Sequence, residues 1–326
     1  MKAVGFYHDG NLEDVTVQQP EPTERQLLVK IKAVSVNPVD TKQFTAGVGQ
    51  FEEPRILGYD AAGVVERVGD EVEQFQEGDE VYYAGDVTKL GTNSEYHLVD
   101  ERIVAKKPRS LSFSESAAVP LTTITAWEAL FDRMGVKKQR EENAGKKLLI
   151  VGAAGGVGSM AIQLAKWVGL SVTATASRKE TKEWVHALGA DHVINHGDIL
   201  ADGQDLYSYV LCCTHLSDYW ESITAACAPQ GNICSIVAEE PLDLSLLKTK
   251  SITFSYEFMF TRSMYETDDQ IAQHELLTEA AQLFDEGVLK STVQDVYSPI
   301  NAQNITHAHE KLKSGRVIGK IVVESF

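Results

Sequence analysis

The sequence predicts an α/β protein with two parts, a β-rich first part and a doubly wound parallel sheet with helices on both faces. Three observations lead to this prediction. Residues 1 to about 120 contain short strand-like runs separated by Gly, Asp and Pro. From residue 147 onward, apolar strand-like runs alternate with helical patterns, which is typical of a parallel sheet. Where the first of these strands ends, the stretch VGAAGGVGSM (151–160) holds four glycines.

The strand-like runs of the first part are short, and several alternate apolar with polar residues. They cover residues 27–36, 61–69, 78–85 and 94–108. Turn-forming residues separate them, so we expect a barrel or a sandwich. Residues 116–135 then show helical spacing, and the charged run KKQREENAGKK (137–147) predicts an exposed connector.

The alternating part predicts a regular series of elements. Strands are expected over 147–151, 171–176, 192–196, 209–213, 232–238 and 251–258, with helices near 158–169, 180–188 and 217–227. After about residue 266 we expect a helix over 274–289, a short strand, a second helix and a last strand in GKIVVES. Repeated strand–helix–strand units place the strands in parallel, with helices covering both faces of the sheet.

Composition narrows the class of protein. The net charge of −17 makes nucleic acid an unexpected partner. No apolar stretch approaches the 18 residues of a membrane span, and the first residues, MKAVGFYHDG, lack the apolar centre of a signal peptide. The four cysteines all fall within residues 212–234 and do not form a disulfide framework, so we expect a reducing, cytoplasmic location.

The glycine-rich stretch lies where the first strand of the alternating part turns into its first helix. Gly152, Gly155 and Gly158 fit the spacing G-x-x-G-x-x-G, a relative of the dinucleotide fingerprint. Glycines permit a tight turn, let the backbone approach a pyrophosphate and let the helix pack closely on the strand. A bend without a ligand is the alternative interpretation. We predict a dinucleotide cradle formed by Gly152, Ala153, Ala154, Gly155, Gly156, Val157 and Gly158.

The end of the second strand indicates which dinucleotide is bound. An NAD site carries an acidic residue there, whereas this strand is followed by Ser177, Arg178 and Lys179, with no acid before Glu180. A hydroxyl and a guanidinium suit the 2′-phosphate of NADP(H), because Arg offers two parallel donors. A solvated start of a helix is the alternative. We predict NADP(H), bound in part by Ser177 and Arg178.

Motifs spread over nearly the whole chain resemble the medium-chain dehydrogenase/reductase superfamily. They are SVNPVDTKQ (35–43), GYDAAGVVERVG (58–69), PLTTITAWEAL (120–130), GAAGGVGS (152–159), LGADHVINH (188–196) and GRVIGKIVV (315–323). Within the superfamily the match is to the zinc-independent, quinone-oxidoreductase-like branch, and YEFMFTRSMYET (256–267) resembles a subgroup labelled zinc-type alcohol dehydrogenase-like. The resemblance implies a GroES-like β-barrel substrate domain from residues 1–121 and 266–326, a Rossmann domain from residues 122–265, an active site in the cleft between them, and a homodimer.

The residues that hold zinc in other members of the superfamily are missing here. The turn that carries a zinc-binding Cys in those members reads NPVDTK, Tyr59 stands in place of a ligand His, and the four-cysteine lobe expected near residues 85–105 is absent. We therefore expect no metal. Without a Lewis acid to stabilise an alkoxide, the favoured chemistry is reduction of an activated acceptor, a quinone or an α,β-unsaturated carbonyl compound.

The resemblance also suggests residues for the chemistry and for cofactor contacts. Tyr59 is the first candidate for an oxyanion donor, and packing inside the barrel is the alternative. Asn37 and Asp40 either line the pocket or shape the NPVD turn. Further cofactor contacts are expected at Thr122, Thr125, His196, Val237, Ala238 and Lys320. A helix cap is the alternative for Thr122, a plain surface position for His196 and an ordinary strand charge for Lys320.

The sequence therefore predicts a zinc-independent, NADPH-dependent oxidoreductase that transfers hydride to quinones or α,β-unsaturated carbonyl compounds. Two alternatives stay open at this point. One is an enoyl-thioester reductase, which would need a deep apolar channel. The other is an NADPH-binding protein without catalysis, because a fold does not by itself imply chemistry. The physiological substrate and the proton donor are not indicated by any motif.

Overall fold

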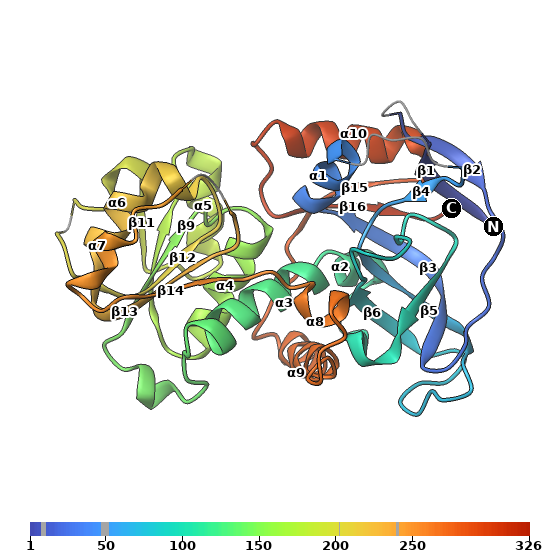
Figure 1. Cartoon of the computed structure of the whole chain (residues 1–326), viewed down its shortest axis with the longest axis horizontal. Coiled ribbons are helices and arrows are strands. Elements are labelled where there is room, and N and C mark those ends of the chain that lie inside the picture. Colours follow the sequence, from blue (N-terminus) through green and yellow to red (C-terminus); the bar gives the residue numbers. More distant parts are fainter. Residues whose placement is uncertain (8–10, 47–51, 202, 239–240) are drawn as a thin grey trace. The chain divides into compact units, whose positions relative to one another are not determined.

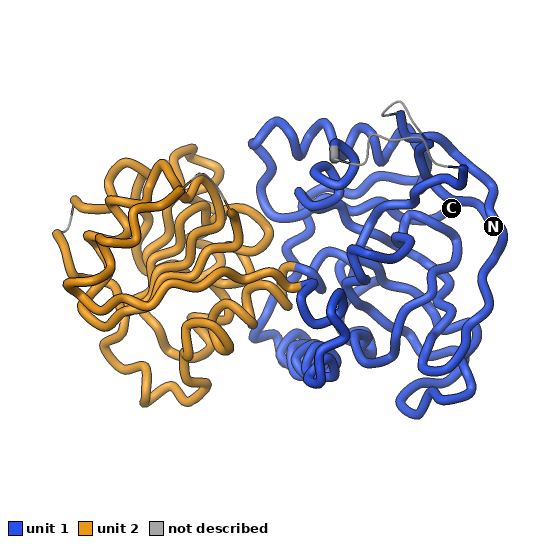
Figure 2. Tube along the Cα trace, in the orientation of Figure 1, with its two compact units in different colours: residues 1–121, 260–326 blue, residues 122–259 orange. Residues whose placement is uncertain are grey.

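A computed structural model of the chain describes residues 1–7, 11–46, 52–201, 203–238 and 241–326 (Figure 1). The chain forms two compact units (Figure 2). Unit 1 comprises Met1–Leu121 and Phe260–Phe326, and unit 2 comprises Thr122–Met259. The sequence predicted that the second segment of unit 1 begins at residue 266, whereas in the structure it begins at Phe260. The ring of Phe260 packs against the ring of Tyr59, with 5.2 Å between their centroids.

Unit 2 is built on a six-stranded sheet in which every neighbouring pair is parallel. Its strand order is β11–β10–β9–β12–β13–β14. These strands are β9 (Lys147–Val151), β10 (Ser171–Thr175), β11 (His192–Ile194), β12 (Tyr207–Cys212), β13 (Cys227–Ser235) and β14 (Thr253–Tyr256). In order along the chain this is 3-2-1-4-5-6, the arrangement of the Rossmann fold. The predicted doubly wound parallel sheet is confirmed.

Helices alternate with these strands because apolar residues recur with helical spacing between them. They are α4 (Gly156–Trp167), α5 (Lys179–Ala187), α6 (Leu216–Ala226) and the short α7 (Ser245–Lys248). All four residues Leu148–Val151 of β9 are buried, as expected for a strand covered on both faces. On one face, Leu149 and Val151 join Trp220 and Ile223 of α6 in one core cluster.

Several strand ends in unit 2 differ from their predicted positions, most of all those of β13 and β11. β13 begins at Cys227 rather than 232, because Cys227 pairs with Tyr207 of β12 before a register shift that ends where Asn232 pairs with Tyr209. The Pro and Gly in the segment CAPQG hide the strand pattern. β13 ends at Ser235, so Val237 and Ala238 lie beyond the strand. β11 ends at Ile194, which leaves His196 in a 3-10 helix, η4 (His196–Asp198).

The predicted helical stretch 116–135 is divided. It forms α2 (Phe113–Ala117), α3 (Pro120–Trp127) and a π-helical turn, η2 (Glu128–Arg133). Proline lacks the N–H that would continue α2 and is well suited to begin a new helix, so α3 starts at Pro120. A 3-10 helix, η3 (Arg140–Asn143), lies within the charged connector, where Asn143 is buried and donates to the backbone oxygen of Val168 at 2.8 Å.

Unit 1 is mainly antiparallel. A seven-stranded sheet runs β15–β16–β3–β5–β6–β8 with β7 paired to β3, and a three-stranded sheet runs β2–β1–β4. The strands are β1 (Lys2–Phe6), β2 (Glu13–Thr16), β3 (Gln26–Val36), β4 (Arg55–Ile56), β5 (Asp60–Val68), β6 (Glu80–Ala84), β7 (Tyr96–Asp100), β8 (Val104–Lys106), β15 (Val293–Tyr297) and β16 (Lys320–Glu324). The predicted β-rich first part is confirmed, and β16 from the end of the chain pairs with β3 near its start.

The helices of unit 1 are α1 (Pro38–Ala46), a 3-10 turn η1 (Glu101–Ile103), α2, the short α8 (Thr261–Met264), α9 (Ala272–Asp285) and α10 (Ala302–Lys313). α9 ends four residues before the predicted position 289 because Gly287, with φ of +72°, terminates it in the left-handed conformation that favours glycine. No helix among the described residues is long and apolar enough to cross a bilayer.

Candidate active site

The glycine loop joins the carboxyl end of β9 to the start of α4, as the sequence predicts. Gly152 has φ of +80°, and its N–H donates to Thr175 Oγ1 at the end of β10 at 2.9 Å. The N–H of Ala153 donates to the backbone oxygen of Thr175 at 3.3 Å. These two hydrogen bonds hold the loop against the neighbouring strand β10. The loop lies at the carboxyl ends of the strands, beside β9, which lies between β10 and β12, and ligands of such folds bind at these ends.

Two further glycines of the loop have different structural requirements. A Cβ on Gly158 would lie 2.6 Å from the Cα and the backbone oxygen of Ala153, so α4 packs against the loop at a distance that only glycine permits. Gly155 precedes α4 with φ of −75° and ψ of 177°, and a Cβ there would meet no atom closer than 3.9 Å. Gly155 immediately precedes the first turn of α4, and the first N–H groups of a helix have no acceptors within it.

Ser177 and Arg178 lie just past the carboxyl end of β10, and both are exposed. Arg178 precedes the first residue of α5 in extended conformation, and its backbone oxygen accepts a hydrogen bond from Thr181 Oγ1 at 2.8 Å. Since β10 is the direct neighbour of β9, the structure brings both residues to the same edge of the sheet as the glycine loop. Their predicted contact with a 2′-phosphate stays a prediction.

The other predicted cofactor residues of unit 2 fall into two groups. Thr122 and Thr125 are buried within α3, and because that helix begins at Pro120, Thr122 is not its cap. His196, Val237 and Ala238 follow the carboxyl ends of β11 and β13. His196 lies 5.9 Å from the ring of Tyr219, and burial together with the nearby His215 lowers its pKa, so its imidazole is neutral at neutral pH. Their contacts with a cofactor stay predictions.

Sequence reasoning missed Thr175 and Thr214, which shape the glycine loop, whereas Cys213 was expected as a small core residue near the cofactor. Thr175 holds the loop by the two bonds described above. A Cβ on Gly152 would lie 2.7 Å from Cγ2 of Thr214 and 3.6 Å from Cβ of Cys213, so both residues after β12 pack against the loop. Burial raises the pKa of the Cys213 thiol, which is therefore protonated at neutral pH. The sequence signal that could have identified these residues is their place directly at or after the predicted strands, because residues that follow parallel strands lie together at one end of the sheet.

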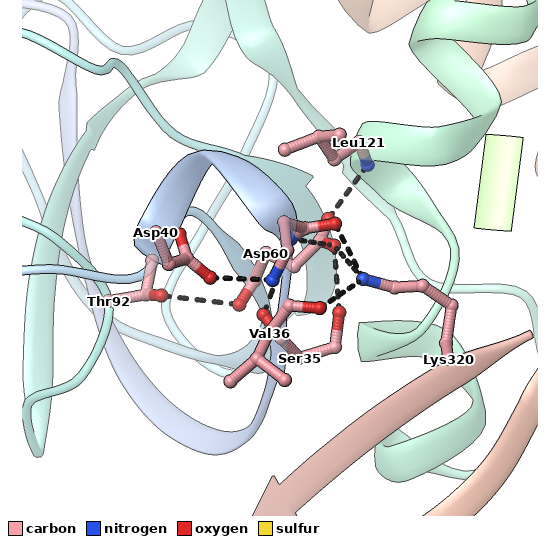
Figure 3. A network of polar contacts seen from close by, with 8 residues as sticks. Ser35, Val36, Asp40, Asp60, Thr92, Leu121 and Lys320 are labelled. Atoms are coloured by element: carbon pink, nitrogen blue, oxygen red, sulfur yellow. Dashed lines mark hydrogen bonds and ion pairs between the residues drawn. The ribbon is translucent and has the colours of Figure 1, made fainter. Parts of the chain in front are cut away.

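The predicted catalytic residues lie in unit 1, where Asn37 and Asp40 belong to a buried polar network centred on Asp60 (Figure 3). Asp60 begins β5 and has no exposed surface. Its Oδ2 accepts hydrogen bonds from Ser35 Oγ at 2.7 Å, Asn37 Nδ2 at 2.8 Å and Lys320 Nζ at 3.2 Å. Its Oδ1 accepts from the backbone N–H of Leu121 at 2.7 Å. Four donors thus converge on one carboxylate, from β3, from Asn37 between β3 and α1, from β16 and from the start of α3.

Lys320 is the cation of this network. Its side chain is 4% exposed, and Nζ donates to the backbone oxygen of Val36 at 2.9 Å and to Asn37 Oδ1 at 2.6 Å, besides Asp60. The three N–H groups of the ammonium therefore have three acceptors within unit 1. This arrangement favours a structural or positioning role for Lys320, and the cofactor contact predicted for it stays a prediction. The alternative of an ordinary strand charge also stays open, although the ammonium is buried rather than solvated.

Asn37 and Asp40 form the start of α1. Pro38 is its first residue, and Asp40 Oδ2 accepts from the backbone N–H of Asn37 at 2.7 Å, the return bond of a helix capping box. The interpretation that these residues shape the turn is thus supported directly. Asp40 is also fully buried, and its other oxygen, Oδ1, has no hydrogen-bond partner among the described residues. An acidic oxygen left in this state needs an additional explanation.

Tyr59 precedes Asp60 and is 2% exposed. Burial raises the pKa of Tyr59, and the neighbouring Asp40 raises it further, so the phenol stays protonated at neutral pH. A protonated phenol can donate a hydrogen bond to a developing oxyanion. It also packs in the interior of unit 1 against Phe260, so the packing role considered for Tyr59 is observed, and its catalytic role stays a prediction.

The first comparison with known proteins concerns whole-chain relatives. A zinc-type alcohol dehydrogenase-like protein of Staphylococcus epidermidis is 43% identical over 99% of this chain and 99% of its own length. The chain belongs to the medium-chain dehydrogenase/reductase superfamily. It is thus an oxidoreductase of that superfamily. Family models match as well, an alcohol dehydrogenase GroES-like domain over residues 23–109 and a zinc-binding dehydrogenase over residues 188–323. The first supports the GroES-like assignment of unit 1.

Two other members of the superfamily are described by their reactions. The 2-methylene-furan-3-one reductase of Solanum lycopersicum is 32% identical, over 99% of this chain and 79% of its own length. The quinone oxidoreductase of Escherichia coli, solved in complex with NADPH, has a TM-score of 0.83 and 25% identity, over 99% of this chain and 100% of its own. Several relatives carry zinc in their names. Among the residues that the structure describes, no three His, Cys, Asp or Glu side chains form a group that could hold a metal ion.

Proposed function

We propose that this member of the superfamily is an NADPH-dependent, zinc-independent reductase of quinones or α,β-unsaturated carbonyl compounds. The observation that carries the proposal is the edge of the unit 2 sheet, where the glycine loop and the exposed Ser177 and Arg178 follow adjacent strands. Bound there, NADPH would supply a hydride. The names of the tomato and Escherichia coli relatives support an enone or a quinone as the acceptor.

The space around the glycines of the loop fits a bound dinucleotide. Gly152 and Gly158 are positions that a side chain could not occupy without displacing neighbours, whereas Gly155 leaves open space before the first turn of α4. This pattern suits a pyrophosphate that is approached by backbone and held by the N–H groups of residues 156–158. At the end of β10, the guanidinium of Arg178 and the hydroxyl of Ser177 supply the charge and the donors that a 2′-phosphate requires.

The positive charge of the Lys320 ammonium beside the predicted catalytic residue Asn37 supports a reaction without a metal ion. Lys320 places a buried ammonium between Asn37 and Asp60, and Asp60 is saturated by four donors. A divalent cation beside these groups would be repelled by the ammonium at low dielectric. In its place, the protonated hydroxyl of Tyr59 is the proposed donor to the oxyanion that forms on a conjugated acceptor.

The decisive assay measures NADPH oxidation against a panel of acceptors: a quinone, an enal, an enone, an enoyl-CoA and a simple aldehyde. We expect turnover of the quinone, enal or enone and little turnover of the aldehyde. Preference for the enoyl-CoA would instead identify an enoyl-thioester reductase. Tight NADPH binding without turnover of any acceptor would identify a non-catalytic NADPH-binding protein, and metal analysis that found about one zinc per chain would contradict zinc independence.

The cofactor assignment is tested by a double substitution, Ser177→Ala with Arg178→Glu. Loss of charge-assisted hydrogen bonds predicts that the Kd for NADPH rises about 10- to 100-fold. The Kd for NADH should change little, since NADH lacks the 2′-phosphate. Lys147→Glu is the matched control, because Lys147 is exposed at the opposite end of β9 and should leave both Kd values unchanged. Equal affinity of the double variant and the wild type for NADPH would refute the assignment.

A further inference from the structure

The buried network of unit 1 contains two carboxyl groups and one cation. Asp40 and Asp60 have no exposed surface, and Lys320 is the ammonium beside them. If both carboxyls were ionised, the network would carry one uncompensated negative charge away from water, which is costly. The neutral combination is one carboxylate, one ammonium and one carboxylic acid. The hydrogen bonds indicate which carboxyl holds the proton.

The donors are distributed unequally between the two carboxyls. Asp60 accepts four hydrogen bonds, one of them from the ammonium of Lys320. Asp40 accepts one, from the backbone N–H of Asn37 to Oδ2, and its Oδ1 has no partner among the described residues. Donors stabilise the charged form of a carboxyl, so Asp60 is the carboxylate and Asp40 is the acid, with its proton on the unpartnered oxygen.

The electrostatics agree with this assignment. Burial raises the pKa of Asp40 to about 7, although the Asn37 N–H and Lys320 act in the opposite direction and Asp60 adds to the rise. The charged and titratable groups that face Asp40 are Lys320 from β16, Asp60 from β5 and Tyr59 just before β5. Asp40 is thus a carboxyl that exchanges its proton near neutral pH, the property required of an acid that must be recharged in each cycle.

We propose that Asp40 is the proton donor of the reduction, and that Lys320 and Asp60 are positioning residues that keep its proton in place. This inference rests on the proposed function. When the β-carbon of an enone accepts a hydride, its C=C electrons move to give an enolate. The O–H bond of Asp40 then breaks, its proton forms a C–H bond with the α-carbon of the enolate, whose C=O bond is restored, and Asp40 becomes a carboxylate. Water returns a proton to it, and Tyr59 only donates a hydrogen bond.

The two positioning residues affect Asp40 in opposite directions, which makes the proposal sharply testable. Asp60→Asn removes a negative charge and leaves Lys320 to stabilise ionised Asp40, so the pKa of Asp40 should fall by about one pH unit or more. Lys320→Met removes the positive charge, so the pKa of Asp40 should rise by a similar amount. The double variant removes both charges and should return the pKa toward the wild-type value.

Infrared spectroscopy measures this proton without any turnover. The C=O band of a protonated carboxyl should be strong in the wild type at pH 6 and lose half of its intensity around pH 7, and it should be missing in Asp40→Asn, which identifies it. Asp295→Asn removes the surface ion pair with Lys311 elsewhere in unit 1 and should leave the titration unchanged. Absence of an Asp40 band throughout pH 5–9, or shifts of the same sign in Asp60→Asn and Lys320→Met, would overturn the proposal.

Folding can be separated from titration. Lys320→Met alone leaves buried Asp60 without its cation and can lose stability, whereas the double variant leaves no unpaired buried charge. If Lys320→Met does not fold, Asp60→Asn and the double variant make the same comparison, since the first should lower the pKa and the second should restore it. Lys320→Arg keeps the positive charge and should keep Asp40 titrating within about one pH unit of the wild type.

The kinetic experiment varies NADPH at a saturating concentration of an enone. In Asp40→Asn, kcat should fall about 100-fold while the KM for NADPH stays unchanged, and the alkaline limb of the wild-type kcat profile should follow the infrared titration. An unchanged kcat in Asp40→Asn overturns the role of Asp40 as donor. If the wild type reduces no acceptor, the proposed function and the donor role fail together, and the infrared titration alone then decides whether Lys320 and Asp60 hold the proton on Asp40.

Discussion

Gly158 offers a test of the close packing between α4 and the loop that precedes it. In Gly158→Ala the new methyl would lie 2.6 Å from two backbone atoms of Ala153, well inside the 3.4 Å at which ordinary contact begins. Backbone cannot rotate away as a side chain can, so α4 must move by about 1 Å. Overpacking of this kind costs about 1–3 kcal/mol, and alanine recovers up to about 1 kcal/mol through its helix propensity. We expect a net loss of about 1–2 kcal/mol.

The assay is differential scanning calorimetry without cofactor, followed by titration with NADPH. The loss corresponds to a fall in Tm of about 2–8 °C, and the displaced helix start should weaken NADPH binding at least about 10-fold. Gly155→Ala is the matched control. Its methyl meets nothing closer than 3.9 Å and its φ of −75° suits alanine, so Tm should change by less than about 2 °C while NADPH binding weakens. A Gly158→Ala protein with wild-type Tm and wild-type affinity would refute this reasoning.

Two further predictions concern stability. Burial, reinforced by Glu128, raises the pKa of Glu257, so its contribution is complete below the ordinary carboxyl value of about 4.3 and is lost as pH rises through the raised value. Glu257→Gln imitates the protonated acid, and its stability in urea relative to the wild type should therefore increase from pH 5 to pH 9; a constant difference would contradict this. Ser112 caps α2 by accepting from the N–H of Glu115, so Ser112→Ala should cost about 1 kcal/mol, whereas Thr41→Ala on an exposed turn of α1 should cost less than about 0.5.

The parts of the fold that local sequence encodes were predicted well. β9 occupies residues 147–151 as expected, because a short run of aliphatic residues bounded by lysines and glycine has few other conformations. The loop after it follows from the conformational freedom of Gly152. Where a boundary was wrong, a local signal was ambiguous: Pro120 both ends one helix and begins another, and the segment CAPQG reads as a turn although it starts β13.

The polar network of unit 1 could not be predicted in the same way. Lys320 donates a hydrogen bond to the backbone oxygen of Val36, which is 284 residues away in the sequence. No residue pattern near Val36 or Lys320 indicates that the two are in contact. Lys320 was therefore predicted as a cofactor contact and Tyr59 as a catalytic residue, while Asp60 beside Tyr59 was overlooked. One signal was present in retrospect. Asp60 and Lys320 each stand at the start of a run of small or aliphatic residues, and a charge at the end of a buried strand requires a partner.

The insertion of β16 between β15 and β3 has a consequence for biosynthesis. β3, β5 and β7 leave the ribosome early, but the Ala33–Val36 part of one edge of β3 stays unpaired until residues 320–324 have been made. At about 5–20 residues per second, the 284 residues between Val36 and Lys320 take about 15–60 s to translate. During this time unit 2 is complete, whereas the nascent unit 1 exposes a strand edge and a carboxylate without its cation. We expect chaperones to bind the nascent chain in this interval, and folding of unit 1 to begin only once β16 has emerged.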